Sequence, residues 1–136
     1  MSEFKIGNVF KGALAGGLGA GVVNLGVYAV GSALGAKYLV LPPDATQLEV
    51  VSMERCFLPS VFFALLAATV FAGLLKVTPA KAWKVFLCLA AVVYVLMIPG
   101  PFIAIVDDLT ASIAFEVMHL VASAGIVLGI GKLGRG

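Results

Sequence analysis

Charged side chains are scarce in this sequence. Asp, Glu, Lys and Arg make up 12% of its 136 residues, against about 25% in an ordinary soluble domain. There is no Lys/Arg-rich run and no aromatic platform on which nucleic-acid bases could stack, so the sequence does not predict a nucleic-acid-binding protein. The small net charge of +2 therefore needs another explanation.

Enzyme and cofactor motifs are also missing. The sequence has no Walker lysine, no Ser-His-Asp set and no zincin motif. The glycine-rich stretch around Gly17 follows no predicted strand, so it does not indicate a nucleotide-binding loop. We expect no nucleotide and no cofactor, and an enzyme is conceivable only as an intramembrane one.

Long apolar stretches are what the sequence has in abundance, and hydrophobic residues make up 62% of it. A bilayer-spanning helix needs about 20 apolar residues. Four stretches meet this need and predict spans at about 12–36, 56–75, 82–98 and 109–131. The first is longer than the core of a signal peptide, so we expect it to be a retained span. The predicted fold class is all-α: residues 1–136 form one membrane domain, a polytopic bundle of four transmembrane helices.

The third predicted span meets Pro99-Gly100-Pro101 near its end. A helix uninterrupted from 82 to 98 is about 26 Å long, just short of the hydrocarbon thickness. We expect the helix to end there and residues 102–106 to turn at the membrane interface. A kinked helix that continues through the prolines is the alternative.

The basic residues are divided unevenly between the two sides of the predicted membrane. Seven of the nine lie on the side that holds both termini: Lys5, Lys11, Lys76, Lys81, Lys84, Lys132 and Arg135. Lys37 and Arg55 lie on the other side. Because positive charge is retained on the cytoplasmic side during insertion, the N- and C-termini are both predicted to be cytoplasmic.

Glycines cluster in the first predicted span. Gly17, Gly21, Gly31 and Gly35 share one helical face with Asn24 and Tyr28. Small residues let membrane helices approach closely. The pattern predicts a helix-packing face that carries a polar amide at mid-depth.

The last predicted span contains the only strongly polar groups expected inside the membrane, Glu116 and His119. They share one helical face with Ser112 and Ser123, because the four residues follow an i, i+4, i+7, i+11 series. Counting 1.5 Å per residue places Asn24, Tyr28 and Tyr94 at similar depths. We therefore expect a polar core in which Asn24, Tyr28 and Tyr94 face Glu116 and His119.

Two interpretations of this polar core are open. An ionisable group inside a membrane often marks a pathway or a binding site, which favours a proton relay or a site for an ion or a cationic ligand. Alternatively, neutral Glu116 and His119 join helices through hydrogen bonds. Glu-x-x-His resembles half of a di-iron motif, but His119 is the only histidine. No metal site is predicted, because one would require a symmetric oligomer.

The whole chain resembles a family of small, uncharacterised four-span bacterial membrane proteins, classed as a domain of unknown function. The resembling features are the glycine- and alanine-rich first span with Asn24, the Leu41-Pro42-Pro43 segment, and Met118-His119-Leu120. The resemblance implies a four-helix membrane fold in a bacterial inner membrane. It implies no activity and no functional residue.

Three functions remain open from the sequence. The glycine face and the lack of an extramembrane domain favour a helical interaction subunit, whose partners are the bilayer, itself or other membrane subunits. A proton, ion or small-solute channel or transporter based on Glu116 and His119 is the alternative. An intramembrane enzyme or a binder of a lipophilic ligand is third.

Overall fold

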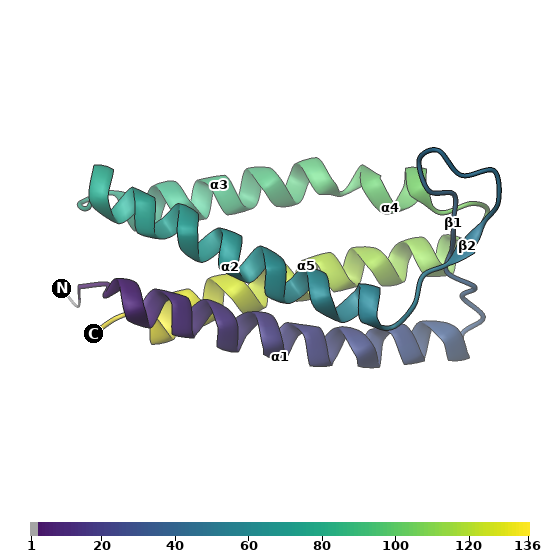
Figure 1. The fold of residues 1–136 in the computed structure, drawn as a ribbon, viewed down its shortest axis with the longest axis horizontal. Coiled ribbons are helices and arrows are strands. Elements are labelled where there is room, and N and C mark those ends of the chain that lie inside the picture. The colour runs from purple at the N-terminus through teal and green to yellow at the C-terminus, as the bar shows by residue number, and fades with distance from the viewer. Residues whose placement is uncertain (1–2) are drawn as a thin grey trace.

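A computed structural model of the chain describes residues 3–136. Figure 1 shows its fold, coloured from purple at the N-terminus to yellow at the C-terminus. The elements are α1 (Ile6–Ala33), β1 (Leu39–Val40), β2 (Glu49–Val50), α2 (Glu54–Val77), α3 (Ala82–Met97), α4 (Pro99–Ala104) and α5 (Leu109–Leu133). Within this described part, four helices are long and apolar enough to cross a membrane, α3 and α4 together forming one of them. The prediction of an all-α membrane protein with four spanning helices is confirmed.

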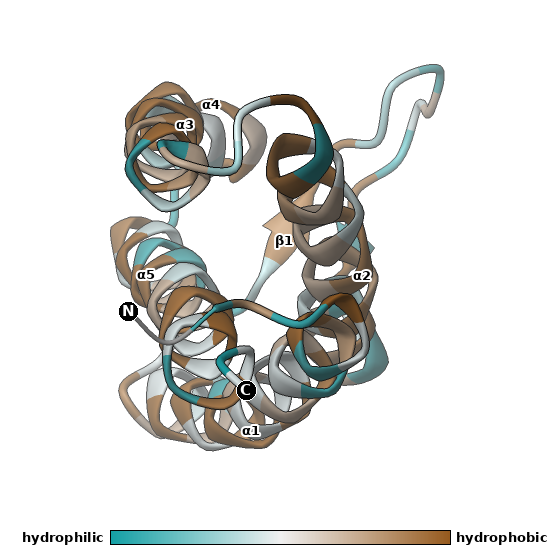
Figure 2. Ribbon diagram, turned by 90° about the vertical axis from the view of Figure 1, so that its left-hand side faces the viewer, coloured by the Kyte–Doolittle hydropathy of each residue, from teal (hydrophilic) through white to brown (hydrophobic). Residues whose placement is uncertain are grey.

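The four helices form an uneven bundle. α1 packs most extensively on α5 and then on α2, whereas α3 makes smaller contacts with α2 and α5. Figure 2, which views the bundle along its length, shows α3 on the side opposite α1. The sequence explains this difference, because α1 is rich in glycine while α3 contains none and carries bulky Val, Leu and Phe side chains.

The closest helix contact joins α1 to α5 through glycines. Gly12 lies against Gly129, and Gly16 lies against Gly125. A Cβ added at Gly125 would lie only 2.9 Å from the Gly16 carbonyl oxygen. Both helices thus carry a Gly-x-x-x-Gly motif, the spacing that lets membrane helices approach backbone to backbone. The glycine face predicted from the sequence did not include these four residues.

Two of the predicted packing glycines face α2. A Cβ at Gly17 would meet Ala64 Cβ at 2.6 Å and the Ser60 carbonyl oxygen at 2.8 Å, and a Cβ at Gly21 would meet the Phe57 ring at 2.7 Å. α1 therefore uses neighbouring faces for α5 and for α2.

The other two predicted packing glycines lie near the end of α1. Gly31 lies beneath the Tyr38 hydroxyl, so it packs against a loop residue. Gly35 does not belong to the packing face, because α1 ends at Ala33 and no described side chain or backbone lies within 4 Å of a Cβ at Gly35. Its φ of 95° instead ends the helix, while the Ala36 N–H donates to the Gly31 carbonyl at 2.9 Å.

The first helix also starts earlier than the predicted span. It begins at Ile6 and includes Lys11, whereas the sequence placed the start of the span at residue 12. A lysine near a membrane interface can extend its ammonium group to water while its backbone stays helical, so Lys11 does not mark the start of the helix. α2 likewise extends two residues beyond its predicted span at each end, and α5 extends two residues beyond its predicted span at the C-terminal end.

The Pro99-Gly100-Pro101 segment kinks the third span without ending it. Ile98 keeps helical angles, φ −51° and ψ −46°, and α4 resumes at Pro99. The expected end at Ile98 is therefore corrected in favour of the alternative, a helix that continues through the prolines. Proline is tolerated at the first position of α4, where its missing N–H costs least.

The loop between α1 and α2 folds back onto the bundle at what we call the hairpin end. β1 and β2 pair antiparallel, with Leu39 opposite Val50. Tyr38 is 1% exposed, and its hydroxyl donates to the Tyr28 carbonyl at 3.0 Å. Burial raises the pKa of Tyr38 to about 12, so this hydroxyl remains a donor at neutral pH. The Tyr38 ring stacks on Tyr28 with 4.2 Å between centroids.

Asp108 joins the same loop to α5 through hydrogen bonds. Its carboxylate accepts hydrogen bonds from the backbone N–H of Ala111 at 2.8 Å and of Lys37 at 2.6 Å. Desolvation acts to raise the pKa of Asp108, but these backbone hydrogen bonds outweigh it and the pKa is lowered. The carboxylate therefore serves both as the N-cap of α5 and as an anchor for the chain that follows α1.

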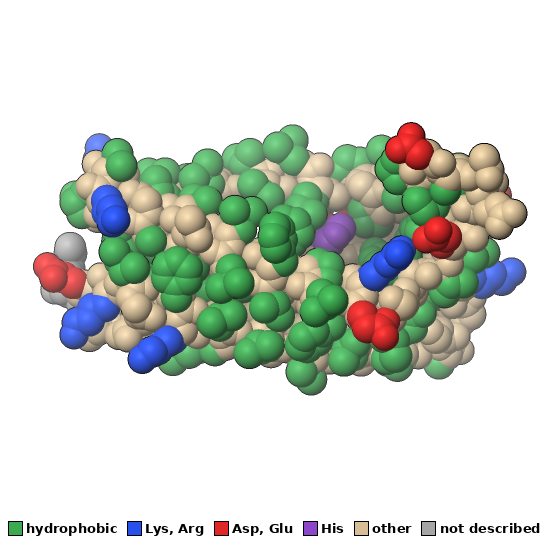
Figure 3. All heavy atoms as spheres, viewed as in Figure 1, with side chains coloured by type: hydrophobic (Ala, Val, Ile, Leu, Met, Phe, Trp, Pro, Cys, Tyr) green, Lys and Arg blue, Asp and Glu red, His purple; other side chains and the backbone are tan. Residues whose placement is uncertain are grey.

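Both termini lie at the opposite end, which we call the terminal end (Figure 1). The Lys5 N–H donates to the Gly134 carbonyl at 3.0 Å, and the Arg135 guanidinium lies 5.1 Å from the centroid of the Phe4 ring. Figure 3 shows basic side chains at this end and acidic ones mostly at the other. A cytoplasmic location of the terminal end stays a prediction.

Candidate functional site: a lateral cavity between α2, α3 and α5

A cavity of about 310 Å³ lies between α2, α3 and α5, with Asn24 of α1 at its base. It exists because α3 does not approach the bundle closely, in contrast to the glycine contact of α1 with α5. Figure 3 shows the hollow on one face of the molecule, with the histidine visible beside it. In a membrane this face is turned toward lipid, so the cavity opens sideways.

The cavity is long and narrow. Its wall on α2 extends from Arg55 to Val70, which at 1.5 Å per residue is about 22 Å. Its wall on α3 extends from Phe86 to Met97, or about 16 Å. A volume of about 310 Å³ spread along such a length leaves room for an extended chain and not for a broad ring system.

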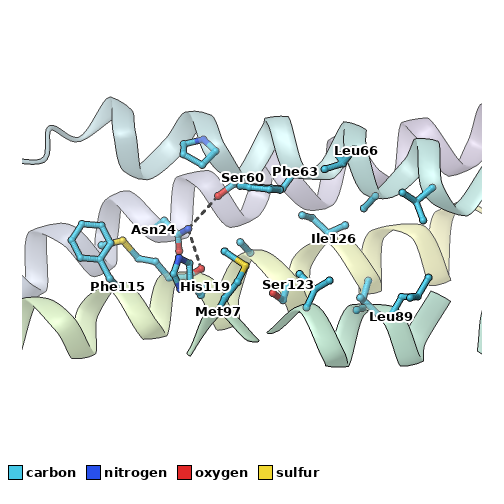
Figure 4. A pocket seen from close by; sticks show the side chains of 18 of the residues that line it. Asn24, Ser60, Phe63, Leu66, Leu89, Met97, Phe115, His119, Ser123 and Ile126 are labelled. Atoms are coloured by element: carbon cyan, nitrogen blue, oxygen red, sulfur yellow. Dashed lines mark hydrogen bonds between the residues drawn. The ribbon is translucent and has the colours of Figure 1, made fainter. Parts of the chain in front are cut away.

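Polar groups are confined to one half of the cavity. Arg55, in the first turn of α2, lines the cavity at the hairpin end. Asn24, Ser60 and His119 follow deeper in (Figure 4). From Ser123 toward the terminal end the lining is apolar and is made by Leu66, Ala67, Val70, Phe86, Leu89, Ala90, Ile126 and Val127. The site therefore matches an amphipathic molecule, one with a polar group at one end and a hydrocarbon tail.

Asn24 is the most buried polar residue of the site, at 2% exposure. Its side-chain nitrogen donates to the Ser60 hydroxyl at 3.2 Å and to the Met118 carbonyl at 3.3 Å (Figure 4). Its carbonyl oxygen, Oδ1, has no hydrogen-bond partner among residues 3–136. An unpaired buried acceptor costs about 1–3 kcal/mol, so a donor that reached it would be stabilised.

His119 connects the cavity to Glu116. His119 lines the cavity, and its Nδ1 lies 3.8 Å from Glu116 Oε2, too far for a hydrogen bond. Within the described residues, Nδ1 and both carboxylate oxygens lack hydrogen-bond partners. Tyr94 of α3 lies beside Glu116. Glu116 and His119, two titratable groups, thus lie close together without a hydrogen bond between them.

The structure brings only part of the predicted polar core together. Asn24, His119 and Ser123 line the cavity, and Glu116 and Tyr94 lie next to it. Two predicted members lie elsewhere. Tyr28 donates to the Val51 carbonyl at 2.9 Å at the hairpin end, and Ser112 donates to the carbonyls of Pro101 at 3.3 Å and Asp108 at 3.1 Å.

Tyr28 and Ser112 thus do not line the cavity, and their hydroxyls bond to backbone carbonyls outside it. Helical spacing did not predict the loop that accepts from Tyr28 or the kinked helix that accepts from Ser112. The Ser112 hydroxyl supplies a hydrogen bond to backbone carbonyls near the Pro-Gly-Pro kink. Irregular backbone that is buried at membrane depth needs such a partner.

Sequence reasoning missed Ser60 and Arg55. Ser60 is the only hydroxyl in the first turns of α2, and its position one residue after Pro59 could have marked it as a polar group facing the bundle. Arg55 was counted only as an interfacial charge. For metals, no group of three His, Cys, Asp or Glu in the part of the chain that is described could hold an ion.

The comparison with protein-family models gives one match, to the family of unknown function DUF6069, over residues 5–135. That match extends over nearly the whole chain. The chain belongs to this family. DUF6069 carries no assigned activity, and neither a curated protein nor a solved structure matches the chain. For this DUF6069 member, function has to be argued from the cavity.

Proposed function

We propose that this DUF6069 membrane protein binds the extended hydrocarbon chain of a small amphiphile in the lateral cavity. The observation that carries the proposal is the division of the cavity into a polar half around Asn24 and an apolar half along α2, α3 and α5. Its volume of about 310 Å³ is at the lower end of the range for small-molecule sites.

Because the cavity is surrounded by lipid, its polar half contributes most to the selection of a ligand. A hydrocarbon chain that moves from the bilayer into the cavity gains little from the hydrophobic effect, because lipid tails are already apolar. Its binding must come from packing and from hydrogen bonds that the bilayer interior does not offer. The unpaired Asn24 Oδ1, His119 and Arg55 are such groups, and they favour a ligand with a polar headgroup.

A matched pair of substitutions on α3 tests the proposal. Ala90 lines the cavity, whereas its neighbour Ala91 is exposed and is not among the lining residues. We expect Ala90→Phe to fill the cavity and Ala91→Phe to add bulk on the lipid side. Native mass spectrometry with added C16 monoacylglycerol is expected to show one bound molecule per chain. It should show at least tenfold weaker binding in A90F and unchanged binding in A91F. Equal binding by both variants would contradict the proposal.

A proton or ion pathway is the second candidate, and one observation favours it. Glu116 and His119 lie 3.8 Å apart, and no partner within residues 3–136 satisfies the carboxylate oxygens or His119 Nδ1. A proton or a cation between them would satisfy both. If this pair conducts, Glu116→Gln abolishes a pH-dependent flux in reconstituted vesicles while the fold is retained. A flux that is unaltered in E116Q would remove this candidate.

The assembly role predicted from the sequence stays a prediction. Three of the four glycines that supported it, Gly17, Gly21 and Gly31, pack against α2 or Tyr38 within the chain, so self-association would use a surface other than theirs. α3 has the smallest buried share of the four spans and offers that surface. The native mass of the gently extracted protein tests this role: a mass above that of one chain with its lipids supports it, and a monomer contradicts it.

A further inference from the structure

We infer that the amphiphile in the cavity carries a single negative charge on its headgroup and that Arg55 binds this headgroup. The inference rests on the proposed function, since it names the class of ligand for the same cavity. It follows from the position of Arg55, the weakness of its present contact and the charges around it.

Arg55 lies where a headgroup would have to be. It is in the first turn of α2 and lines the cavity at the hairpin end. Ser60 follows five residues later, about 8 Å deeper along the helix. Among the described residues that line the cavity, Arg55 is the only one with a permanent charge. A ligand whose chain occupies the apolar half therefore presents its other end to a guanidinium group.

The present partner of Arg55 is weakly held. Its guanidinium lies 3.6 Å from the Glu49 carboxylate, and the two side chains are 60% and 52% exposed. An exposed ion pair of this kind contributes little to stability. A carboxylate or phosphate can offer two parallel hydrogen bonds to the guanidinium fork, which is a stronger arrangement. An anionic headgroup can thus displace Glu49, which belongs to β2.

The surrounding charge limits the headgroup to one negative charge. The hairpin end carries the acidic residues Asp44, Glu49, Glu54, Asp107 and Asp108 against Lys37 and Arg55, a net charge of 2 − 5 = −3. This field repels a headgroup with several negative charges more than one with a single charge. Arg55 attracts the headgroup locally, while the acidic residues around it repel additional negative charge. The site therefore favours ligands whose headgroup carries one negative charge.

The experiment compares three single-chain amphiphiles of equal tail length by native mass spectrometry: a fatty acid, a monoacyl glycerophosphate and a monoacylglycerol. The first carries a carboxylate, the second a phosphate with a second ionisation near neutral pH, and the third no charge. The measured quantity is the ratio of anionic to neutral affinity, in the wild type, in Arg55→Gln and in Lys37→Gln. Lys37 is an exposed cation of the same end that does not line the cavity, so K37Q is the matched control.

We expect the wild type to prefer the fatty acid at least tenfold over the monoacylglycerol, and R55Q to lose that preference while K37Q keeps it. If the glycerophosphate binds tighter than the fatty acid, the monoanion rule is overturned. If R55Q retains the preference, the role of Arg55 is overturned. Both results are distinct from failure of the proposed function, which would appear as unchanged binding of all three amphiphiles to A90F.

Discussion

The side-chain nitrogen of Asn24 in α1 donates a hydrogen bond to the Ser60 hydroxyl in α2 at 3.2 Å. This single contact joins two helices and at the same time forms the base of the cavity, because both residues line it (Figure 4). The same amide also donates to the Met118 carbonyl of α5 at 3.3 Å. One buried side chain therefore sets the separation of three helices around the site.

Substitution of Asn24 by alanine is expected to lower the free energy of unfolding by about 1 kcal/mol, since interhelical hydrogen bonds in membranes average about 0.6 and reach about 1.7 kcal/mol. A double-mutant cycle with Ser60→Ala measures the part that belongs to the Asn24–Ser60 contact. Unfolding in mixed micelles provides the data. Strictly additive effects of the two substitutions would contradict a direct interaction.

The glycine contact between α1 and α5 yields a second prediction. A Cβ at Gly16 overlaps the Gly125 carbonyl, whereas nothing described lies within 4 Å of a Cβ at Gly19 in the same helix. We expect Gly16→Ala to destabilise the protein by about 1–3 kcal/mol, the usual cost of overpacking.

Gly19→Ala is the control for that substitution. It adds the same methyl group three residues away and is expected to be neutral or slightly stabilising, because alanine favours the helix more than glycine does. Thermal unfolding of the two variants in one detergent gives the comparison. Equal stability of G16A and G19A would mean that α1 and α5 do not approach as described.

Asp108 predicts a dependence of stability on pH. Its pKa is lowered in the folded protein by hydrogen bonds from the Ala111 and Lys37 backbones, despite desolvation acting the other way. A carboxyl group with a lowered pKa adds stability that is present above its unfolded pKa of about 3.9 and is lost as pH falls through the folded value. We expect the hairpin end to loosen below about pH 4.

Hydrogen exchange of the Lys37 amide, measured between pH 3 and pH 6 with the intrinsic pH dependence of exchange removed, reports this loosening. Asp108→Asn is the variant for comparison: its Oδ1 can still accept from the Ala111 N–H as a helix cap, but its Nδ2 cannot accept from the Lys37 N–H, so the Lys37 amide should be weakly protected at every pH. In D108N the pH dependence should disappear. A wild-type Lys37 amide that stays equally protected at pH 3 would disprove the coupling.

The sequence predicted most of the fold because each of its signals is local. Apolar runs of span length and the uneven distribution of lysines predicted four helices with both termini at one end, as observed. The close α1–α5 contact could also have been predicted. Gly12-x-x-x-Gly16 and Gly125-x-x-x-Gly129 are present in the sequence, but the helical face that carries Asn24 contains Gly17 and Gly21 instead.

The candidate site was predicted in part. Counting along the helices placed Asn24 and His119 at similar depths, and periodicity put Ser123 on the face of His119; the structure places all three along one cavity. The cavity itself was not predictable, because it depends on how far α3 stands from α2 and α5. Tyr38 illustrates the same limit. Its positive φ of 54° and its burial against Tyr28 depend on a loop conformation that no local pattern encodes, and they removed Tyr28 from the site.

The most direct test of the account is photolabelling with a C16 fatty acid that carries a diazirine near the end of its chain, followed by mapping of the labelled residues. Binding in the cavity predicts labels on the apolar half of its lining, at Leu66, Val70, Leu89 and Ile126. It also predicts that A90F removes these labels while A91F keeps them. Labels spread evenly over lipid-facing residues outside the lining, such as Val92, Leu96 and Leu120, and unchanged in A90F, would contradict the account.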